Sequence, residues 1–115
     1  MFEALFGKKG FQNISQKEAR EKLSAGRKAV LLDVRTPEEY EELHIPNSIS
    51  LPLAQLKSGI GKVAGNRDAE IIVYCLSGAR AAAACRQLAA MGYANVSNMG
   101  GIRSWSYETE RGGKS

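Results

Sequence analysis

The clearest pattern along the chain is a set of apolar runs that are too short to be helices. Two of them, residues 29–34 (AVLLDV) and 71–74 (IIVY), are almost continuous, which is typical of strands buried on both faces of a parallel sheet. Weaker patterns predict short strands at residues 13–14, 48–51 and 95–98, the first of them at an edge of the sheet.

Helix-start signals lie between these runs. The capping-box sequence Ser15-Gln16-Lys17-Glu18 predicts a helix that runs to about Ser24, with Gly26 at its C-terminal cap. A second helix is predicted to start at Thr36-Pro37 and to end near His44, because Pro46 disfavours helical geometry at the residue before it.

The later part of the chain continues the alternation. An alanine-rich segment, residues 79–91, is predicted as a helix, and a shorter one is expected over residues 53–57. Residues 58–68 contain three glycines and are expected to be a connecting stretch. Gly100-Gly101 turns the chain into a last helix, in which Trp105 is a packing anchor. Alternating strands and helices predict an α/β fold with a largely parallel sheet.

Composition and charge bound the class of protein. The chain has 115 residues, of which 43% are hydrophobic and 24% charged, as in one soluble globular domain. The net charge of +4 owes much to Lys8, Lys9, Arg111 and Lys114. No basic cluster alternates with aromatic residues, so no nucleic-acid partner is predicted; the weaker alternative is attraction of a small anionic substrate. Residues 1–7 lack the features of a signal peptide, and we expect a cytoplasmic protein without a membrane span.

Cysteine and histidine are scarce. Two cysteines and one histidine exclude the usual four-ligand zinc site and a disulfide framework, and we predict neither metal nor cofactor. A Cys75–Cys85 bridge is conceivable, but the cytoplasm would keep it reduced. Cys85 falls on one helical stripe with Ala81 and Leu88, which predicts a small, inert core residue.

Cys75 is the candidate nucleophile. It ends the run at residues 71–74 and faces the N-terminus of the helix predicted from Ala79. Backbone N–H groups and the positive helix dipole converge at such a position and favour a thiolate. Asp33 and Arg35 close the other long run, and because parallel strands share a carboxyl edge, we expect them at the same edge as Cys75.

Four segments in order resemble single-domain rhodaneses, a family of sulfurtransferases. These are Asp33 to Tyr40 (DVRTPEEY), His44 to Ser48 (HIPNS), Cys75 to Arg80 (CLSGAR) and Met99 to Trp105 (MGGIRSW). They resemble the family's D-x-R strand end, its H-I-P-G-A turn, its C-x-x-G-x-R loop and its G-G-h-x-x-W closing segment. In the turn, Asn and Ser replace the usual Gly-Ala.

The resemblance implies a fold and a division of the chain. The fold is a three-layer α/β arrangement, with a mainly parallel sheet of about five strands between helices. The implied domain covers residues 13–107, after an N-terminal extension at 1–12 and before a C-terminal tail at 108–115. Nothing in the sequence demands more than a monomer.

The resemblance also implies a chemistry. Cys75 would take a sulfur atom from a donor such as thiosulfate and pass it from a persulfide to cyanide or a thiol. The implied substrate-binding residues are Leu76, Ser77, Gly78, Ala79 and Arg80. Their N–H groups would hold the persulfide anion, and the Arg80 guanidinium would bind the anionic donor or steady the loop.

The remaining polar residues are expected to have structural roles. Asp33 and Arg35 would brace the active-site edge through ion pairs, with Glu39 a candidate partner of Arg35. A direct catalytic role for Asp33 or Arg35 is a secondary alternative. His44 lies in the turn and is expected to be structural, since the donor step needs no general base.

Three alternative functions remain open on the sequence. The active-site loops of dual-specificity phosphatases of the same fold resemble a C-x5-R motif. That motif is one residue longer than the C-x4-R of Cys75 to Arg80, so the loop length favours a sulfur substrate over a phosphate. Arsenate reduction is disfavoured for the same reason. The third alternative is a persulfide carrier or a regulatory module that docks to a partner; the intact cysteine favours an active enzyme.

Overall fold

The computed structural model describes residues 10–26 and 28–112, and its centre is a sheet in which every strand pair is parallel. The strands are β1 (Gln12–Asn13), β2 (Val30–Asp33), β3 (Ile49–Ser50), β4 (Glu70–Cys75) and β5 (Asn95–Gly101). Their order is β1-β5-β4-β2-β3. This confirms the predicted parallel five-stranded sheet. Most of the predicted extension, residues 1–9, and the end of the predicted tail, residues 113–115, lie outside the described residues.

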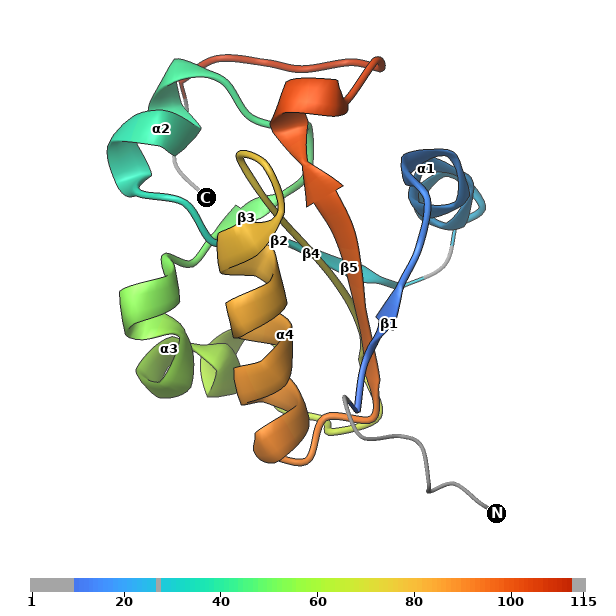
Figure 1. Ribbon diagram of the computed structural model, residues 1–115, viewed down its shortest axis with the longest axis vertical. Coiled ribbons are helices and arrows are strands. Elements are labelled where there is room, and N and C mark those ends of the chain that lie inside the picture. Colours follow the sequence, from blue (N-terminus) through green and yellow to red (C-terminus); the bar gives the residue numbers. More distant parts are fainter. Residues whose placement is uncertain (1–9, 27, 113–115) are drawn as a thin grey trace.

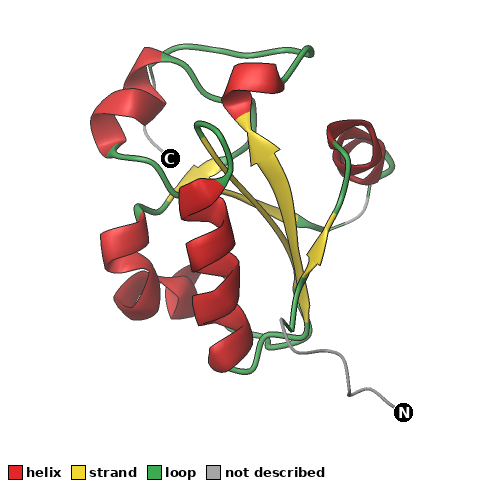
Figure 2. Cartoon of the chain, viewed as in Figure 1, coloured by secondary structure: helices red, strands yellow, loops and turns green. Residues whose placement is uncertain are grey.

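Helices cover both faces of the sheet (Figures 1 and 2). They are α1 (Gln16–Ser24), α2 (Pro37–Glu42), α3 (Leu56–Val63) and α4 (Ala79–Ala90), with short 3-10 turns at Leu53–Gln55 and Ile102–Ser104. In Figure 1, α3 and α4 lie on one side of the strands and α1 lies on the other, which confirms the three-layer arrangement. No helix among the described residues is both long and apolar enough to cross a membrane.

Strand β4 explains why the apolar runs are continuous. Its odd-numbered side chains, including Val73 and Cys75, belong to the core beneath α3 and α4. Its even-numbered side chains, Ile72 and Tyr74, belong to a second core with Ala19 of α1. Because successive side chains of a strand point to opposite faces, a strand between two cores needs apolar residues at every position.

The helix-start signals act as predicted. The Ser15 hydroxyl caps α1 by accepting the Glu18 N–H at 3.0 Å. Thr36 and Glu39 form a reciprocal capping box at the start of α2, where Pro37 is the first helical residue. These side chains satisfy N–H groups that the first turn of a helix leaves unpaired, which fixes both helices at the predicted positions.

Two predicted elements differ from the structure. Residues 58–63 were expected in a connecting stretch but form most of α3, because Leu56 and Ile60 recur at helical spacing and bury themselves in the core. Gly59 reflects close packing: a Cβ there would lie 2.7 Å from Cδ1 of Leu51. The predicted last helix is only the 3-10 turn Ile102–Ser104, and Trp105 follows it in extended backbone.

The segment after the last 3-10 turn packs back on the domain. His44 and Glu110 form an isolated antiparallel bridge with two backbone hydrogen bonds of 2.8 Å. The Gly112 N–H donates to the Glu41 carbonyl at 2.6 Å. These contacts hold residues 110–112 beside α2, although the sequence predicted a tail there.

The ends of β4 and β5 meet at very close range. Cys75 pairs with Gly101, after an irregularity in the ladder that follows Val73. A Cβ on Gly101 would overlap the Leu76 carbonyl group and the Ser77 Cα. The backbone that follows Cys75 therefore rests directly on the end of β5, where there is no space for a side chain.

We predict that Gly101→Ala lowers the free energy of unfolding by about 3 kcal/mol, because its methyl group meets backbone atoms that cannot rotate away. Urea denaturation followed by circular dichroism measures the change. The matched control is Gly61→Ala in α3, where a Cβ meets nothing within 4 Å. That control should gain about 0.5–1 kcal/mol from higher helix propensity. Equal stability of the Gly101→Ala variant and the parent protein would contradict the prediction.

Candidate functional site

Cys75 lies at the carboxyl end of β4 with its side chain buried beneath the first turn of α4. The residue is 1% exposed. Its Sγ accepts the Gly78 N–H at 3.0 Å and the Ala81 N–H at 3.3 Å. Both donors stabilise negative charge on the sulfur. Of the predicted loop N–H groups, the structure thus brings that of Gly78 to the predicted nucleophile, and it adds the N–H of Ala81, which the sequence reasoning did not include among the site residues.

Gly78 shapes this cradle. It is the N-cap residue of α4 and has a φ of +114°, a conformation that side chains other than hydrogen rarely allow. A Cβ at this position would also lie 3.6 Å from Cα of Gly100. The left-handed turn reverses the chain within the loop and points its N–H back at the cysteine sulfur.

Asp33 and Arg35 form a buried ion pair at the adjacent end of β2. The Arg35 Nη2 donates to Oδ2 of Asp33 at 2.7 Å, and the Arg35 backbone N–H donates to Oδ1 at 2.9 Å. Burial alone would lower the pKa of Arg35, but the hydrogen bonds and charge of Asp33, together with smaller effects of Tyr74 and Glu39, raise it. The Nη2 also donates to the Leu43 carbonyl at 2.6 Å, so the pair ties the end of α2 to the sheet.

The predicted pairing of Arg35 with Glu39 is wrong. Glu39 instead binds Arg80, with Nη1 to Oε1 at 2.8 Å and Nη2 to Oε2 at 3.0 Å. These hydrogen bonds are the largest cause that lowers the pKa of Glu39 to about 2, against the opposing effect of burial. The same bonds raise the pKa of Arg80. The Arg80 guanidinium therefore connects the loop to α2. It binds Glu39, and does not bind Asp33 or point into solvent without a partner.

A tyrosine hydroxyl organises the turn beside the site. Tyr74 alternates with Cys75 in β4 and points to the opposite core. Its hydroxyl accepts the Ile45 N–H at 3.1 Å and lies 3.1 Å from the Ser48 Oγ. Burial raises the pKa of Tyr74 and keeps it a neutral phenol. Asn47 in this turn has a φ of +70°, which explains why the family prefers glycine there.

His44 has a structural environment, as predicted. It is 2% exposed and its ring stacks on Tyr40 with 3.7 Å between ring centroids. Its Nδ1 lies 2.8 Å from the Tyr40 carbonyl oxygen and its Nε2 lies 3.0 Å from Oε2 of Glu110. Both ring nitrogens thus contact groups that do not belong to the cysteine loop.

Cys85 is a core residue. It is completely buried on the face of α4 that packs against the sheet, and burial raises the pKa of its thiol to about 12. Both cysteines are free. The expected inertness of this second thiol follows from its environment, because a protonated thiol is a poor nucleophile.

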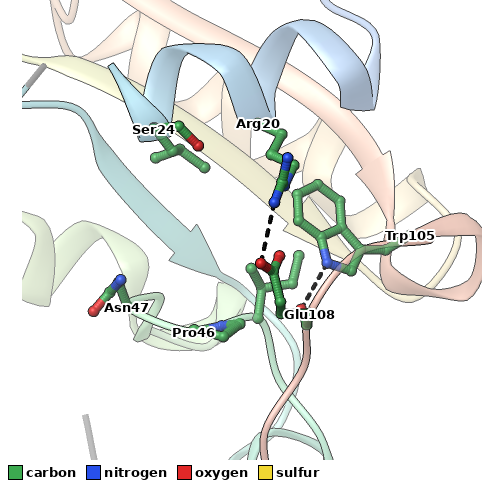
Figure 3. A pocket seen from close by; sticks show the side chains of 8 residues that line it. Arg20, Ser24, Pro46, Asn47, Trp105 and Glu108 are labelled. Carbon is green, nitrogen blue, oxygen red and sulfur yellow. Dashed lines mark hydrogen bonds and ion pairs between the residues drawn. The ribbon is translucent and has the colours of Figure 1, made fainter. Parts of the chain in front are cut away.

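Three surface hollows lie near these elements. One of about 390 Å³ is lined in part by Ser77 and Gly78 of the loop. A second, of about 350 Å³, is lined by glutamates of α2. The third, of about 400 Å³, lies beside α1 (Figure 3). There the Arg20 guanidinium binds Glu108 at 3.1 Å, and the Trp105 indole N–H donates to the Glu108 carbonyl at 2.9 Å. Among the described residues, no group of His, Cys, Asp and Glu side chains has an arrangement that could hold a metal ion.

Besides Ala81, two pieces of this site were missed by the sequence reasoning. One is the Glu39–Arg80 pair, for which the only signal was that the capping-box glutamate of α2 and the loop arginine both lie at the carboxyl edge of the sheet. The other is the Tyr74 hydroxyl, which the alternation of β4 could have assigned to the face opposite Cys75.

The amino-acid sequence is similar to those of two sulfurtransferases. The thiosulfate sulfurtransferase PspE of Escherichia coli is 35% identical over 72 residues, which cover 63% of this chain and 69% of that protein. A sulfurtransferase of Allochromatium vinosum is 33% identical over 94 residues, which cover 81% of this chain and 86% of that protein.

Solved structures share the fold. A thiosulfate sulfurtransferase from Pseudomonas aeruginosa aligns with a TM-score of 0.83 and 28% identity, over 90% of this chain and 21% of that chain. A rhodanese-related protein from Thermoplasma volcanium aligns with a TM-score of 0.74 and 32% identity, over 86% and 97% of the two chains. Residues 15–108 match the family model described as the rhodanese-like domain. With four motifs, fold and relatives in agreement, the chain belongs to the rhodanese-like domain family.

Proposed function

We propose that this protein is a sulfurtransferase that moves a sulfane sulfur through a persulfide on Cys75. The donor is thiosulfate or a similar compound, and the acceptor is a thiophilic nucleophile such as cyanide or a thiol. The observation that carries the proposal is the cradle of two N–H groups, from Gly78 and Ala81, around the Cys75 sulfur. Relatives that are named sulfurtransferases give it further support.

In the first half-reaction the Cys75 thiolate attacks the outer sulfur of thiosulfate. A new Sγ–S bond forms and the S–S bond of the donor breaks. Sulfite leaves as a dianion with the electron pair of that broken bond, and the outer sulfur of the donor keeps its negative charge as the terminal sulfur of the persulfide. The loop N–H groups of Leu76 to Arg80 would stabilise this anion, and the Gly78 N–H, which already donates to the Cys75 sulfur, supports this role, since a cradle of N–H dipoles needs no rearrangement during the reaction.

In the second half-reaction the acceptor attacks the terminal sulfur of the persulfide. With cyanide the products are thiocyanate and the regenerated Cys75 thiolate; with a thiolate the product is a new persulfide. Asp33 and Arg35 act as supporting residues that hold the edge of the sheet on which the loop rests. We propose that the protein works as a cytoplasmic monomer on small molecules, without a cofactor, a membrane or a nucleic acid.

A persulfide carrier is the second candidate. One relative, 34% identical over 84% of this chain and 52% of its own length, is named a putative sulfur carrier protein, from Bacillus subtilis. A carrier would form the persulfide but release its sulfur only to a docked partner. Turnover by the isolated chain with a small acceptor distinguishes the two functions.

We predict that thiosulfate adds one sulfur atom, about 32 Da, to Cys75 and that subsequent cyanide removes it as thiocyanate. Intact-protein and peptide mass spectrometry measure the addition. Cys75→Ser should lose both the addition and thiocyanate formation, by about a thousandfold or more, because the hydroxyl is a far weaker nucleophile at neutral pH.

Cys85→Ser is the matched control. It should keep persulfide formation on Cys75, because the Cys85 thiol has its pKa raised to about 12 by burial and stays protonated at pH 7–9. An unmodified Cys75 after treatment with every donor would refute the proposed function. Persulfide formation without thiocyanate would instead favour the carrier.

Gly78→Ala should slow persulfide formation by about tenfold or more while the protein stays folded. At a φ of +114° an alanine costs about 1–3 kcal/mol, and the loop avoids that strain only by turning the residue-78 N–H away from the sulfur. Stopped-flow or quenched measurements of sulfite release report the rate, with Gly61→Ala as the glycine control. An unchanged rate would mean that this N–H does not contribute to the reaction.

A further inference from the structure

Both arginines of the family motifs are engaged by carboxylates. Arg35 is buried against Asp33, with a side chain that is 5% exposed. Arg80 is more open, at 36% side-chain exposure, yet both of its terminal nitrogens bind Glu39. The predicted role of Arg80 as an anion-binding cation therefore meets an obstacle, because its charge is balanced by a carboxylate of α2.

Glu39 is held in this pairing from its own side. Its Oε1 accepts the Thr36 backbone N–H at 2.9 Å as part of the capping box. Its pKa of about 2, lowered chiefly by the bonds from Arg80, keeps the carboxylate ionised at every pH at which the protein would work. Three further glutamates of α2, at positions 38, 41 and 42, border the same surface hollow as Glu39. The positive charge of Arg80 is thus compensated by the carboxylate of Glu39.

We propose that Glu39 is a specificity-determining residue that makes the site prefer a singly charged sulfur donor to a doubly charged one. This inference rests on the proposed sulfur transfer at Cys75. Glu39 acts through Arg80, whose positive charge it cancels. Without that charge, no charged side chain in the loop offsets the repulsion between a doubly charged donor and the Cys75 thiolate. Arg80 lies beside the sulfur in the structure, because the N–H of the next residue, Ala81, donates to the Cys75 Sγ at 3.3 Å.

Two donors of similar shape isolate this effect. Thiosulfate carries two negative charges, and methanethiosulfonate replaces one charged oxygen by a methyl group and carries one. Both present the same terminal sulfur. With methanethiosulfonate, the Cys75 thiolate forms the same Sγ–S bond and methanesulfinate leaves with the electron pair, so charge and atoms balance as they do with sulfite.

The test is the ratio of kcat/KM for thiosulfate to kcat/KM for methanethiosulfonate, with cyanide as acceptor. Glu39→Gln should raise this ratio about fivefold, the effect of one unit charge at about 4 Å in water. Glutamine also serves at the third position of a capping box, so α2 should keep its start. A ratio of two donors does not move when a variant merely loses part of its activity.

Charge-matched variants sharpen the result. Arg80→Gln leaves Glu39 unbalanced and should lower the ratio. The double variant Glu39→Gln/Arg80→Gln restores a neutral pair and should return the ratio to that of the parent protein. Glu38→Gln removes one charge from the exposed side of the same helix and should change the ratio less than twofold, because solvent screens it.

The outcomes are separable. A ratio that stays constant in Glu39→Gln and Arg80→Gln, or an equal shift in Glu38→Gln, overturns the inference while leaving the sulfur transfer intact. Absence of a persulfide from both donors in the parent protein refutes the proposed function itself. If Glu39→Gln does not fold, the opposite shift expected in Arg80→Gln still decides the inference.

Discussion

The close contact between the cysteine loop and Gly101 is the constraint on which the site depends. The Leu76 carbonyl and the Ser77 Cα occupy the volume that a side chain at position 101 would fill. Because the loop can sink onto the end of β5, it turns through Gly78 and enters α4 within a few residues. That short path brings two N–H groups to one sulfur atom. A looser contact would lengthen the path and open the cradle.

The elements of this arrangement follow from local signals in the sequence. The continuous apolar pattern of residues 71–74 predicts β4 between two cores, and the two cores are observed. Ser15 and Thr36 predict the starts of α1 and α2, since a cap depends only on residues a few positions away. Placing Asp33 and Cys75 at one edge needs only the rule that parallel strands share their carboxyl ends. The position of Cys75, the candidate nucleophile, was therefore accessible to sequence reasoning.

The partners of the side chains were not accessible in the same way. Arg35 lies close to both Asp33 and Glu39 along the chain, whereas Arg80 is 41 residues from Glu39, so sequence spacing does not decide which carboxylate meets which guanidinium. The structure decides it through burial: Arg35 folds back on the fully buried Asp33, and Glu39 is left for Arg80. Helix α3 was missed for a related reason. The glycine at position 59 suggested a loop, but it is explained by close packing against Leu51, a contact that the sequence of the helix alone does not show.

In the proposed mechanism, the backbone N–H groups at Cys75 serve sulfur transfer, whereas the side-chain pair of Glu39 and Arg80 serves donor selectivity. There, the backbone N–H groups of Gly78 and Ala81 would stabilise negative charge on the Cys75 sulfur, and their positions follow from the loop and from α4. Because that stabilisation would come from the backbone, the pairing of Arg80 with Glu39 would leave it intact. We infer that the pair instead changes the electrostatic field that a charged donor meets as it approaches. A change in α2 could thus alter which donors are used while the cradle around Cys75 stays the same.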